Sequence, residues 1–270
     1  TSNNKAEWRS TYGESPEYVL FGDWQVCFQT YADLYKLDPD TIKIARAREV
    51  MEYQMSTSKL DYWHWVDALY MVMPVMVKMY DITKNPLYLE KLHQYLTVTD
   101  SIMYDREVGL YYRDAKYPYP FHKTINGKKD FWSRGDGWAF AAFAKVLKQL
   151  PAEDKYREEY ITRFQTMAKS IAACQQPEGY WTRSLIDPEQ APGPETSGTA
   201  LFTYGFLWGI NNGLLNADIY SPIVEKAWNY LKTTALQADG KIGYIQPVGE
   251  KAIPGQVVDA NSCFNFGIGA

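Results

Sequence analysis

The feature that most constrains the fold is an alternation between two kinds of helical segment. One kind is rich in small and apolar residues on all sides, and the other is amphipathic with one charged face. Helices that are apolar all round are buried, whereas helices with one charged face lie at a surface. The apolar segments are about 17–35, 63–80, 132–148, 196–212 and the tail from about 260. The amphipathic segments are about 40–55, 86–103, 153–174 and 220–236.

This regular succession predicts an inner ring of helices wrapped by an outer ring, with a pair of helices as the unit and a period of about 65 residues. Strand patterns are scarce, so we expect an all-α fold. The pattern gives about five inner and four outer helices, fewer than a closed ring of six pairs. A shorter, open toroid would leave apolar helix faces in water. We therefore expect a single barrel domain over residues 1–270, lacking some terminal helices at both ends.

Composition excludes several classes of function. Hydrophobic residues make up 46% of the chain and the net charge is −4, without a basic block, so neither disorder nor nucleic-acid binding is favoured. No uninterrupted apolar run is long enough to predict a membrane span. Cys27, Cys174 and Cys263 are far apart and are interpreted as small core residues, which leaves the compartment open. No metal-binding spacing, Walker loop or GxSxG motif is present.

Aromatic residues are unusually frequent, at 16% of the chain with 22 Tyr and 9 Trp. Part of this excess suits a site that stacks on sugar rings. The loops before the inner segments are rich in polar, glycine or tryptophan residues, and they read "LDYWHWVD", "GKKDFWSRGDGW", "QAPGPETSGTA" and "GQVVDANSC". We expect them to meet at one end of the barrel, where the free N–H groups of helix N-termini favour a bound anion. The loops "YPYPFHKTINGKKD" and "LIDPEQAPGPE" are expected to wrap over the same end.

Asp67 is the first candidate for chemistry, because it follows Trp63 and Trp65 at the start of a buried helix. Aromatic surroundings raise a carboxyl pKa and a helix N-terminus lowers it, so the group could be a general acid near neutral pH. It could equally be a helix cap or a buried carboxylate held by hydrogen bonds. Asp23, with Gln25 and Gln29 nearby at helical spacing, is another acid on a buried helix, for which a structural network is the simpler interpretation.

The stretch "FWSRGDGW" supplies Arg134, whose planar guanidinium suits a carboxylate, between the stacking surfaces of Trp132 and Trp138. Asp136 in the same stretch could be a second acid or a helix cap. Further along, "PETSGTA" offers Thr196 and Ser197, which suit either an N-cap or a polar rim for a sugar.

Four motifs, "CFQTYADLY", "WVDALYM", "FWSRGDGW" and "ETSGTALFTYG", together resemble the unsaturated glucuronyl and rhamnogalacturonyl hydrolases, glycoside hydrolase families 88 and 105. The resemblance runs from about residue 20 to the end of the chain. It implies an (α/α)6 barrel, in agreement with the alternation of helices. It also implies removal of a 4,5-unsaturated uronic acid from the non-reducing end of lyase-generated oligosaccharides, such as those from pectin. In these families an aspartate protonates C4, water adds at C5, and no cofactor is used.

By this resemblance, Asp67 matches the general acid and Asp23 the second aspartate. Arg134 and Trp138 match residues that contact the unsaturated sugar, and Trp132 begins the same motif. Arg113, in "GLYYRDAKY", falls near a loop that contacts substrate. Trp63, Trp65, Asp136, Thr196 and Ser197 complete the predicted binding set. Asp136 departs from the family, which usually has Asn or Gln there, and an extra carboxylate would repel a uronate or indicate a different neighbouring sugar.

Two other classes remain open. A non-catalytic carbohydrate-binding protein on the same barrel would bind without consuming the double bond, and a sugar epimerase or ordinary uronidase would act on saturated sugars. Asp67 within "WVDALYM" favours the hydrolase. The expected partner is an oligosaccharide, with no nucleic acid or membrane, and the oligomeric state is left open. The resemblance suggests a periplasmic or secreted protein, with the cytoplasm as the alternative.

Overall fold

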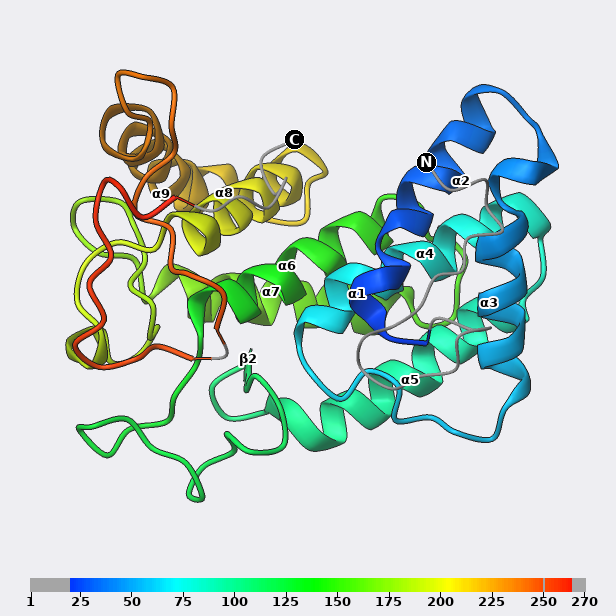
Figure 1. The fold of residues 1–270 in the computed structure, drawn as a ribbon, viewed down its shortest axis with the longest axis horizontal. Coiled ribbons are helices and arrows are strands. Elements are labelled where there is room, and N and C mark those ends of the chain that lie inside the picture. The colour runs from blue at the N-terminus through cyan, green and yellow to red at the C-terminus, as the bar shows by residue number, and fades with distance from the viewer. Residues whose placement is uncertain (1–19, 250, 264–270) are drawn as a thin grey trace.

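The fold is described from a computed structural model, which covers residues 20–249 and 251–263. The inner layer is built from α-helices that follow one another around a curve and pack in sequence order. Figure 1 shows α6 crossing the middle of the molecule, with α8 on one side and α4, α2 and α1 on the other. These inner helices are α1 (Gly22–Gln25), α2 (Cys27–Leu37), α4 (Asp67–Thr83), α6 (Ser133–Leu147) and α8 (Thr196–Asn211).

Outer helices cover the inner layer: α5 packs on α4, α7 on α6 and α9 on α8. They are α3 (Ala45–Ser56), α5 (Leu87–Met103), α7 (Arg157–Ala172) and α9 (Ala217–Tyr230), and a π-helical turn, Leu231–Ala235, continues α9. Short 3-10 turns occur at Thr41–Lys43 and Pro188–Gln190. The alternation of inner and outer helices predicted from the sequence is therefore confirmed for the described residues. No helix among them is long and apolar enough to cross a membrane.

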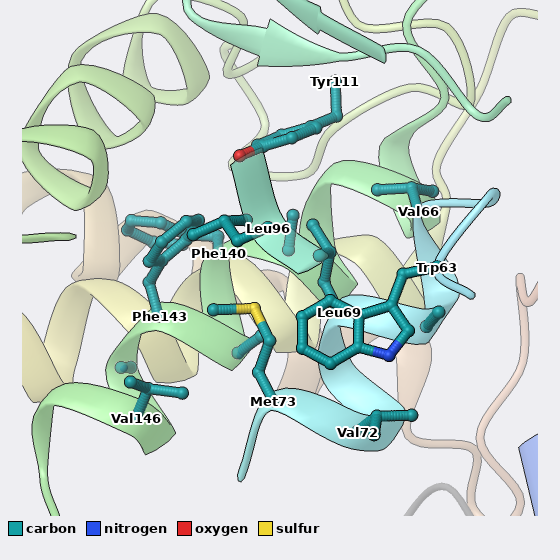
Figure 2. Close-up of a cluster of buried hydrophobic side chains, with 14 of the residues drawn as sticks. Trp63, Val66, Leu69, Val72, Met73, Leu96, Tyr111, Phe140, Phe143 and Val146 are labelled. Atoms are coloured by element: carbon teal, nitrogen blue, oxygen red, sulfur yellow. The ribbon is translucent and has the colours of Figure 1, made fainter. Parts of the chain in front are cut away.

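Burial explains why the two kinds of segment differ. Every residue of α6 except Lys145 is buried, because α4, α7 and α8 surround this helix and its "AFAAFA" run gives each of them a close-packed face. Figure 2 shows how Phe140 and Phe143 of α6 meet Leu69 and Met73 of α4 in this core.

Two expected boundaries differ from the structure. The expected segment 17–35 contains a break at Val26, which separates α1 from α2, and its residues 17–19 lie outside the described part. The expected inner segment from about 260 is described only to residue 263, so the remainder of that prediction also lies outside the described residues.

A short antiparallel hairpin, β1 (Tyr104–Asp105) and β2 (Leu110–Tyr111), leads from α5 towards α6. The two loops that follow, 117–130 and 185–195, are joined to each other. Asn126 Nδ2 donates to both carboxylate oxygens of Asp187, at 3.0 and 3.1 Å, and the amide of Ile125 donates to Gln190 Oε1 at 2.8 Å. We call these contacts the loop latch. The latch places the two loops together beside the N-terminal ends of α6 and α8.

The C-terminal segment, residues 244–249 and 251–256, runs along the same end of the molecule (Figure 1, orange to red). Gln190 Nε2 donates to the carbonyl of Ala252 at 3.0 Å, and Arg183 donates to the carbonyl of Gln256 at 2.6 Å. The amide of Thr196, the first residue of α8, donates to the carbonyl of Tyr244 at 2.9 Å. The segment is thus tied to the loops before α8 and to the start of the helix itself.

Candidate active site

Asp67 is the first residue of α4, and the chain before it is held in place by the segment that follows β2. The amide of Val66 donates to the carbonyl of Arg113 at 2.8 Å, and Trp65 forms an isolated β-bridge with Asp114. These two contacts fix the start of α4 against residues 113–114. They bring Arg113 and Asp67, which are distant in sequence, to the same place.

The Asp67 carboxyl is desolvated: the residue is half-buried, and its Oδ2 is inaccessible and has no hydrogen-bond partner within the described part of the chain. Burial raises the pKa of Asp67 to about 6. The positive charge of Arg113 opposes this rise, the negative charge of Asp23 adds to it, and Arg134 has a smaller opposing effect. A carboxyl with this pKa is protonated in a substantial fraction of molecules near neutral pH and can donate a proton.

Asp23 lies on α1, which packs against α4, and it is exposed. Partial desolvation raises its pKa, while a hydrogen bond with the Trp65 side chain and the charge of Arg113 lower it. Arg113 Nη1 also forms an ion pair with Asp114 at 2.5 Å. The structure therefore brings the two predicted acids, Asp67 and Asp23, within electrostatic reach of one arginine.

Arg134 is 4% exposed, and its guanidinium makes contacts inside the protein. Nε donates to Ser197 Oγ at 2.8 Å, and Nη2 lies 3.6 Å from Glu195 Oε1. Further donors go to the backbone carbonyls of Gln246 and Pro247 in the C-terminal segment. In this conformation the guanidinium binds the protein's own acceptors, so its predicted contact with a substrate carboxylate stays a prediction.

Glu195 is the buried partner of Arg134, and it caps α8. Its Oε1 accepts from the amides of Ser197 (3.3 Å) and Gln246 (3.1 Å), and its Oε2 accepts from the amide of Gly198 at 2.6 Å. The hydroxyl of Ser197 also donates to this carboxylate, at 2.8 Å. The capping interpretation of "PETSGTA" is confirmed, with glutamate as the cap. Sequence reasoning missed the pairing of Glu195 with Arg134, for which no local pattern exists because one residue lies in α6 and the other caps α8.

Thr196 and Ser197 also use their hydroxyl groups internally. The Thr196 hydroxyl lies 2.7 Å from the Tyr230 hydroxyl and donates to the carbonyl of Gly243 at 2.8 Å. Both residues are buried, at 2% and 6% exposed. The structure therefore gives them a structural role at the start of α8 and lends no support to their predicted contact with substrate.

Of the four tryptophans predicted to bind sugar, three lie around Asp67 and Arg134. Trp65 stacks on Phe21 with ring centroids 4.5 Å apart. Trp132 donates through Nε1 to Gln246 Oε1 at 2.9 Å, and Arg134 lies over its ring at 5.3 Å. Trp138 is on the same face of α6 as Arg134, four residues further along.

Trp63 corrects the prediction. It is 1% exposed, its ring centroid lies 5.2 Å from that of Tyr95, and Figure 2 shows it pointing into the core beside Leu69 and Met73. Trp63 is therefore a core residue. Trp65, Trp132 and Trp138 are also buried, at 3%, 4% and 6% exposed, and their contact with a sugar stays a prediction.

Asp136 is a second correction. Its carboxyl is fully buried and accepts a hydrogen bond from the amide of Tyr111, at 2.8 Å, so it faces the β hairpin. Burial raises its pKa well above the usual range, which means that this carboxyl is held neutral. It therefore neither touches nor repels a substrate, and it does not act as a second acid. A protonated carboxyl and a carboxamide form similar hydrogen bonds, so Asp136 suits a position where the resemblance predicts Asn or Gln.

Among residues 20–249 and 251–263, no group of three or more His, Cys, Asp or Glu side chains could hold a metal ion. The histidines are separate: His64 is exposed, the ring of His93 stacks on Tyr156 at 3.6 Å, and His122 Nε2 lies 2.8 Å from Asp130. The three cysteines form no disulfide; Cys27 and Cys174 are partly buried, as expected, whereas Cys263 is exposed.

The described residues thus form a two-layer α-helical toroid of the α/α class, with a desolvated acid, two arginines and several tryptophans near the N-terminal ends of its inner helices. Comparison with known families gives the particular assignment. Residues 3–270 match the model described as Glycosyl Hydrolase Family 88, and the chain belongs to that family. The predicted superfamily is therefore confirmed.

Two curated relatives are both described as "Unsaturated 3S-rhamnoglycuronyl hydrolase". The protein from Formosa agariphila is 36% identical over 219 residues, which cover 80% of this chain and 57% of the relative. The protein from Alteromonas sp. is 35% identical over 208 residues, which cover 77% of this chain and 49% of the relative. The chain therefore spans about half the length of the curated relatives that it matches.

Solved structures give the same fold. One described as a polysaccharide lyase is 73% identical, with a TM-score of 0.92 and coverage of 99% of this chain and 76% of that one. A family 105 glycoside hydrolase from C. acetobutylicum is 21% identical, with a TM-score of 0.70 and coverage of 92% and 75%. The latter similarity shows that the α/α toroid fold is shared.

Proposed function

We propose that this protein removes a 4,5-unsaturated uronic acid from the non-reducing end of oligosaccharides. The observation that carries the proposal is the Asp67 carboxyl, desolvated at the first residue of an inner helix, with its pKa raised to about 6 and with Arg113 and Asp23 beside it. An acid of this strength suits protonation of a carbon atom, which requires a donor that is still protonated near neutral pH.

The proposed reaction consumes one water molecule. Asp67 donates its proton to C4 of the C4=C5 double bond, and water adds its oxygen at C5 while the second water proton returns to Asp67. The C5 hemiketal then opens by breaking the bond from C5 to the ring oxygen. The hemiacetal formed at C1 collapses and releases the linked sugar with its own hydroxyl group. In this proposal Arg113 attracts the uronate carboxylate and Asp23 helps to orient the water.

The names of the curated relatives support rhamnose, sulfated at O3, as the sugar next to the uronate. A test therefore uses two disaccharides, unsaturated glucuronyl-rhamnose with and without the 3-sulfate group. The double bond absorbs in the ultraviolet, and its hydration removes that absorbance. We expect the protein to bleach the absorbance and Asp67→Asn to lose at least about 100-fold in kcat, because a carboxamide cannot donate the proton.

Asp61→Asn is the matched control. It is the same substitution in the same loop, at an exposed residue whose nearest ion pair is with Lys59 at 3.7 Å. Its activity should equal that of the unchanged protein. If Asp67→Asn keeps full activity, or if both variants lose activity equally, Asp67 is not the general acid.

A second candidate function follows from the 73% identical structure described as a polysaccharide lyase. A lyase creates the conjugated double bond, whereas the proposed hydrolase consumes it, so the same absorbance changes in opposite directions. With an intact uronate polysaccharide, a lyase would raise the absorbance and the hydrolase would leave it unchanged. A carbohydrate-binding protein would change the absorbance of neither substrate.

A further inference from the structure

The inner helix α4 has a gap in its backbone hydrogen bonding. Pro74 lies inside the helix and has no N–H group, so the carbonyl of Tyr70, four residues earlier, lacks its helical donor. Gln29 of α2 supplies that donor. Its Nε2 donates to the carbonyl of Tyr70 at 2.7 Å and to that of Met71 at 3.0 Å. Gln29 is 5% exposed, so its side chain is fixed as a bridge between the two helices.

The free end of this bridge holds a lysine. Lys145 is the one residue of α6 that is not buried, and its Nζ donates to Gln29 Oε1 at 2.5 Å. The same ammonium lies 4.4 Å from the centre of the Tyr70 ring and 3.5 Å from the Tyr70 hydroxyl. An ammonium in this position over an aromatic face is attracted by the ring's negative face. Tyr70 is therefore held at two points: Gln29 binds its backbone carbonyl, and Lys145 lies over its ring.

The other neighbour of the Tyr70 ring is Trp138. The two ring centroids are 4.6 Å apart with an angle of 45° between the planes. Trp138 and Lys145 lie on the same face of α6 as Arg134, because Trp138 follows Arg134 by four residues and Lys145 follows Trp138 by seven. A continuous set of contacts thus runs from Gln29 through Lys145 and Tyr70 to Trp138. We call it the lysine relay.

We propose that Lys145 is a positioning residue, which acts through the Tyr70 ring to hold the Trp138 indole in the orientation that contacts the sugar. The proposal rests on the proposed function only in taking Trp138 as a sugar contact. The contacts of the lysine relay themselves involve no catalytic group, and Lys145 lies nearly three helical turns beyond Arg134.

The surrounding charges predict a pH dependence. Burial lowers the pKa of Lys145 to about 8, with a further lowering by Lys78 of α4 and Lys148 of α6 and an opposing effect of Asp33 on α2. Lys78 itself is paired with Asp33. From α8, Tyr204 faces Tyr70, and its pKa is raised by burial and then by the Tyr70 hydroxyl; burial also raises the pKa of Tyr70. Lys145 therefore loses its charge as the pH rises through about 8, while the neighbouring tyrosines stay neutral.

The first test needs no substrate. The protein is labelled with 5-fluorotryptophan, and the fluorine resonance of Trp138 is assigned by its disappearance in Trp138→Phe. We expect Lys145→Met to shift or broaden this resonance, and Lys145→Arg to leave it close to its original position because arginine keeps the charge. Lys78→Met is the control: it removes an equal charge from a lysine that has no contact with the Tyr70 ring, and it should leave the resonance unmoved. An unmoved Trp138 resonance in Lys145→Met would overturn the proposal.

The second test measures binding of unsaturated glucuronyl-rhamnose by calorimetry. The background is Asp67→Asn, which neither turns over nor titrates at that position. We expect Lys145→Met to raise Kd about three- to tenfold, the range of a partly desolvated cation–π contact. In the background protein Kd should rise as the pH passes about 8, and in Lys145→Arg this rise should vanish. A Kd that is flat from pH 7 to 9 in the background protein would overturn the proposal without any substitution at Lys145.

The two tests separate this inference from the proposed function. If the background protein does not bind the disaccharide, the proposed function fails, and the fluorine resonance alone decides whether Lys145 positions Trp138. If the disaccharide binds and only the substitutions at Lys145 have no effect, the proposed function stands and the lysine relay is refuted.

Discussion

The buried contact between Glu195 and Arg134 leads to a quantitative prediction for stability. Glu195 is 0% exposed, and its carboxylate accepts hydrogen bonds from the amides of Ser197, Gly198 and Gln246 and from one hydroxyl group. Glu195→Ala removes all of them at once. It also leaves the Arg134 guanidinium buried without its anionic partner, 3.6 Å away in the unchanged protein.

Removal of one partner from a buried ion pair costs about 3–5 kcal/mol, and the loss of a helix cap alone costs about 1 kcal/mol. We therefore expect Glu195→Ala to lower the free energy of unfolding by about 3–5 kcal/mol. For a domain of this size that corresponds to a fall in Tm of about 6–20 °C. Glu195→Gln, which keeps one acceptor oxygen and loses the charge, should fall between Glu195→Ala and the unchanged protein.

The assay is urea unfolding followed by circular dichroism, with Asn216→Ala as the matched control. Asn216 caps α9 through one hydrogen bond, from the amide of Asp218 at 2.8 Å, and it is exposed. Its removal should cost about 1 kcal/mol. If Glu195→Ala costs no more than Asn216→Ala, the argument that the buried carboxylate stabilises three separate segments is wrong.

Three further predictions follow from single residues. Because a general acid must be protonated, kcat/KM should fall as the pH rises through about 6, the pKa of Asp67. Arg113→Gln removes the main opposing charge, so it should move this fall to higher pH. Steady-state kinetics from pH 4 to 9 measure both effects. The pKa of Asp136 is raised in the folded state, so folding binds a proton there and stability declines as the pH rises above about 4. Asp136→Asn cannot ionise and should raise Tm at pH 7 and flatten its pH dependence, whereas an unchanged profile in thermal unfolding would argue against a neutral carboxyl. Gly205→Ala would bring a methyl group into the ring of Phe140 and should cost about 1–3 kcal/mol, again by urea unfolding; no loss would mean that α6 and α8 separate at little cost.

Helix positions could be predicted from the sequence because each helix carries its own pattern. The segments expected at 86–103 and 196–212 correspond to α5 (Leu87–Met103) and α8 (Thr196–Asn211), where a change from apolar to amphipathic composition marks the layer. Asp67 was expected at the start of a buried helix, and it is the first residue of α4. The position of a helix, its layer and its first residue depend on residues that are close together in the sequence, so the sequence alone can predict them.

The direction of individual side chains could not be predicted in the same way. Trp63 and Trp65 are equivalent by composition, yet Trp63 packs against Tyr95 and the Trp65 side chain forms a hydrogen bond with Asp23. Asp136 follows Arg134 by two residues and points to the β hairpin instead. The partners that decide these directions, such as Tyr111, come from other loops, and no local pattern contains them.

The loop latch has a consequence for how new specificities can be made in this protein. Loops 117–130 and 185–195 are far apart in the sequence, yet Asn126 and Asp187, and likewise Ile125 and Gln190, depend on each other. Replacement of one loop from a related enzyme would leave the buried Asp187 carboxylate without its amide donors. An engineered chimera should therefore exchange the two loops at the rim of the barrel together, as one module. The acid on α4 would stay unchanged.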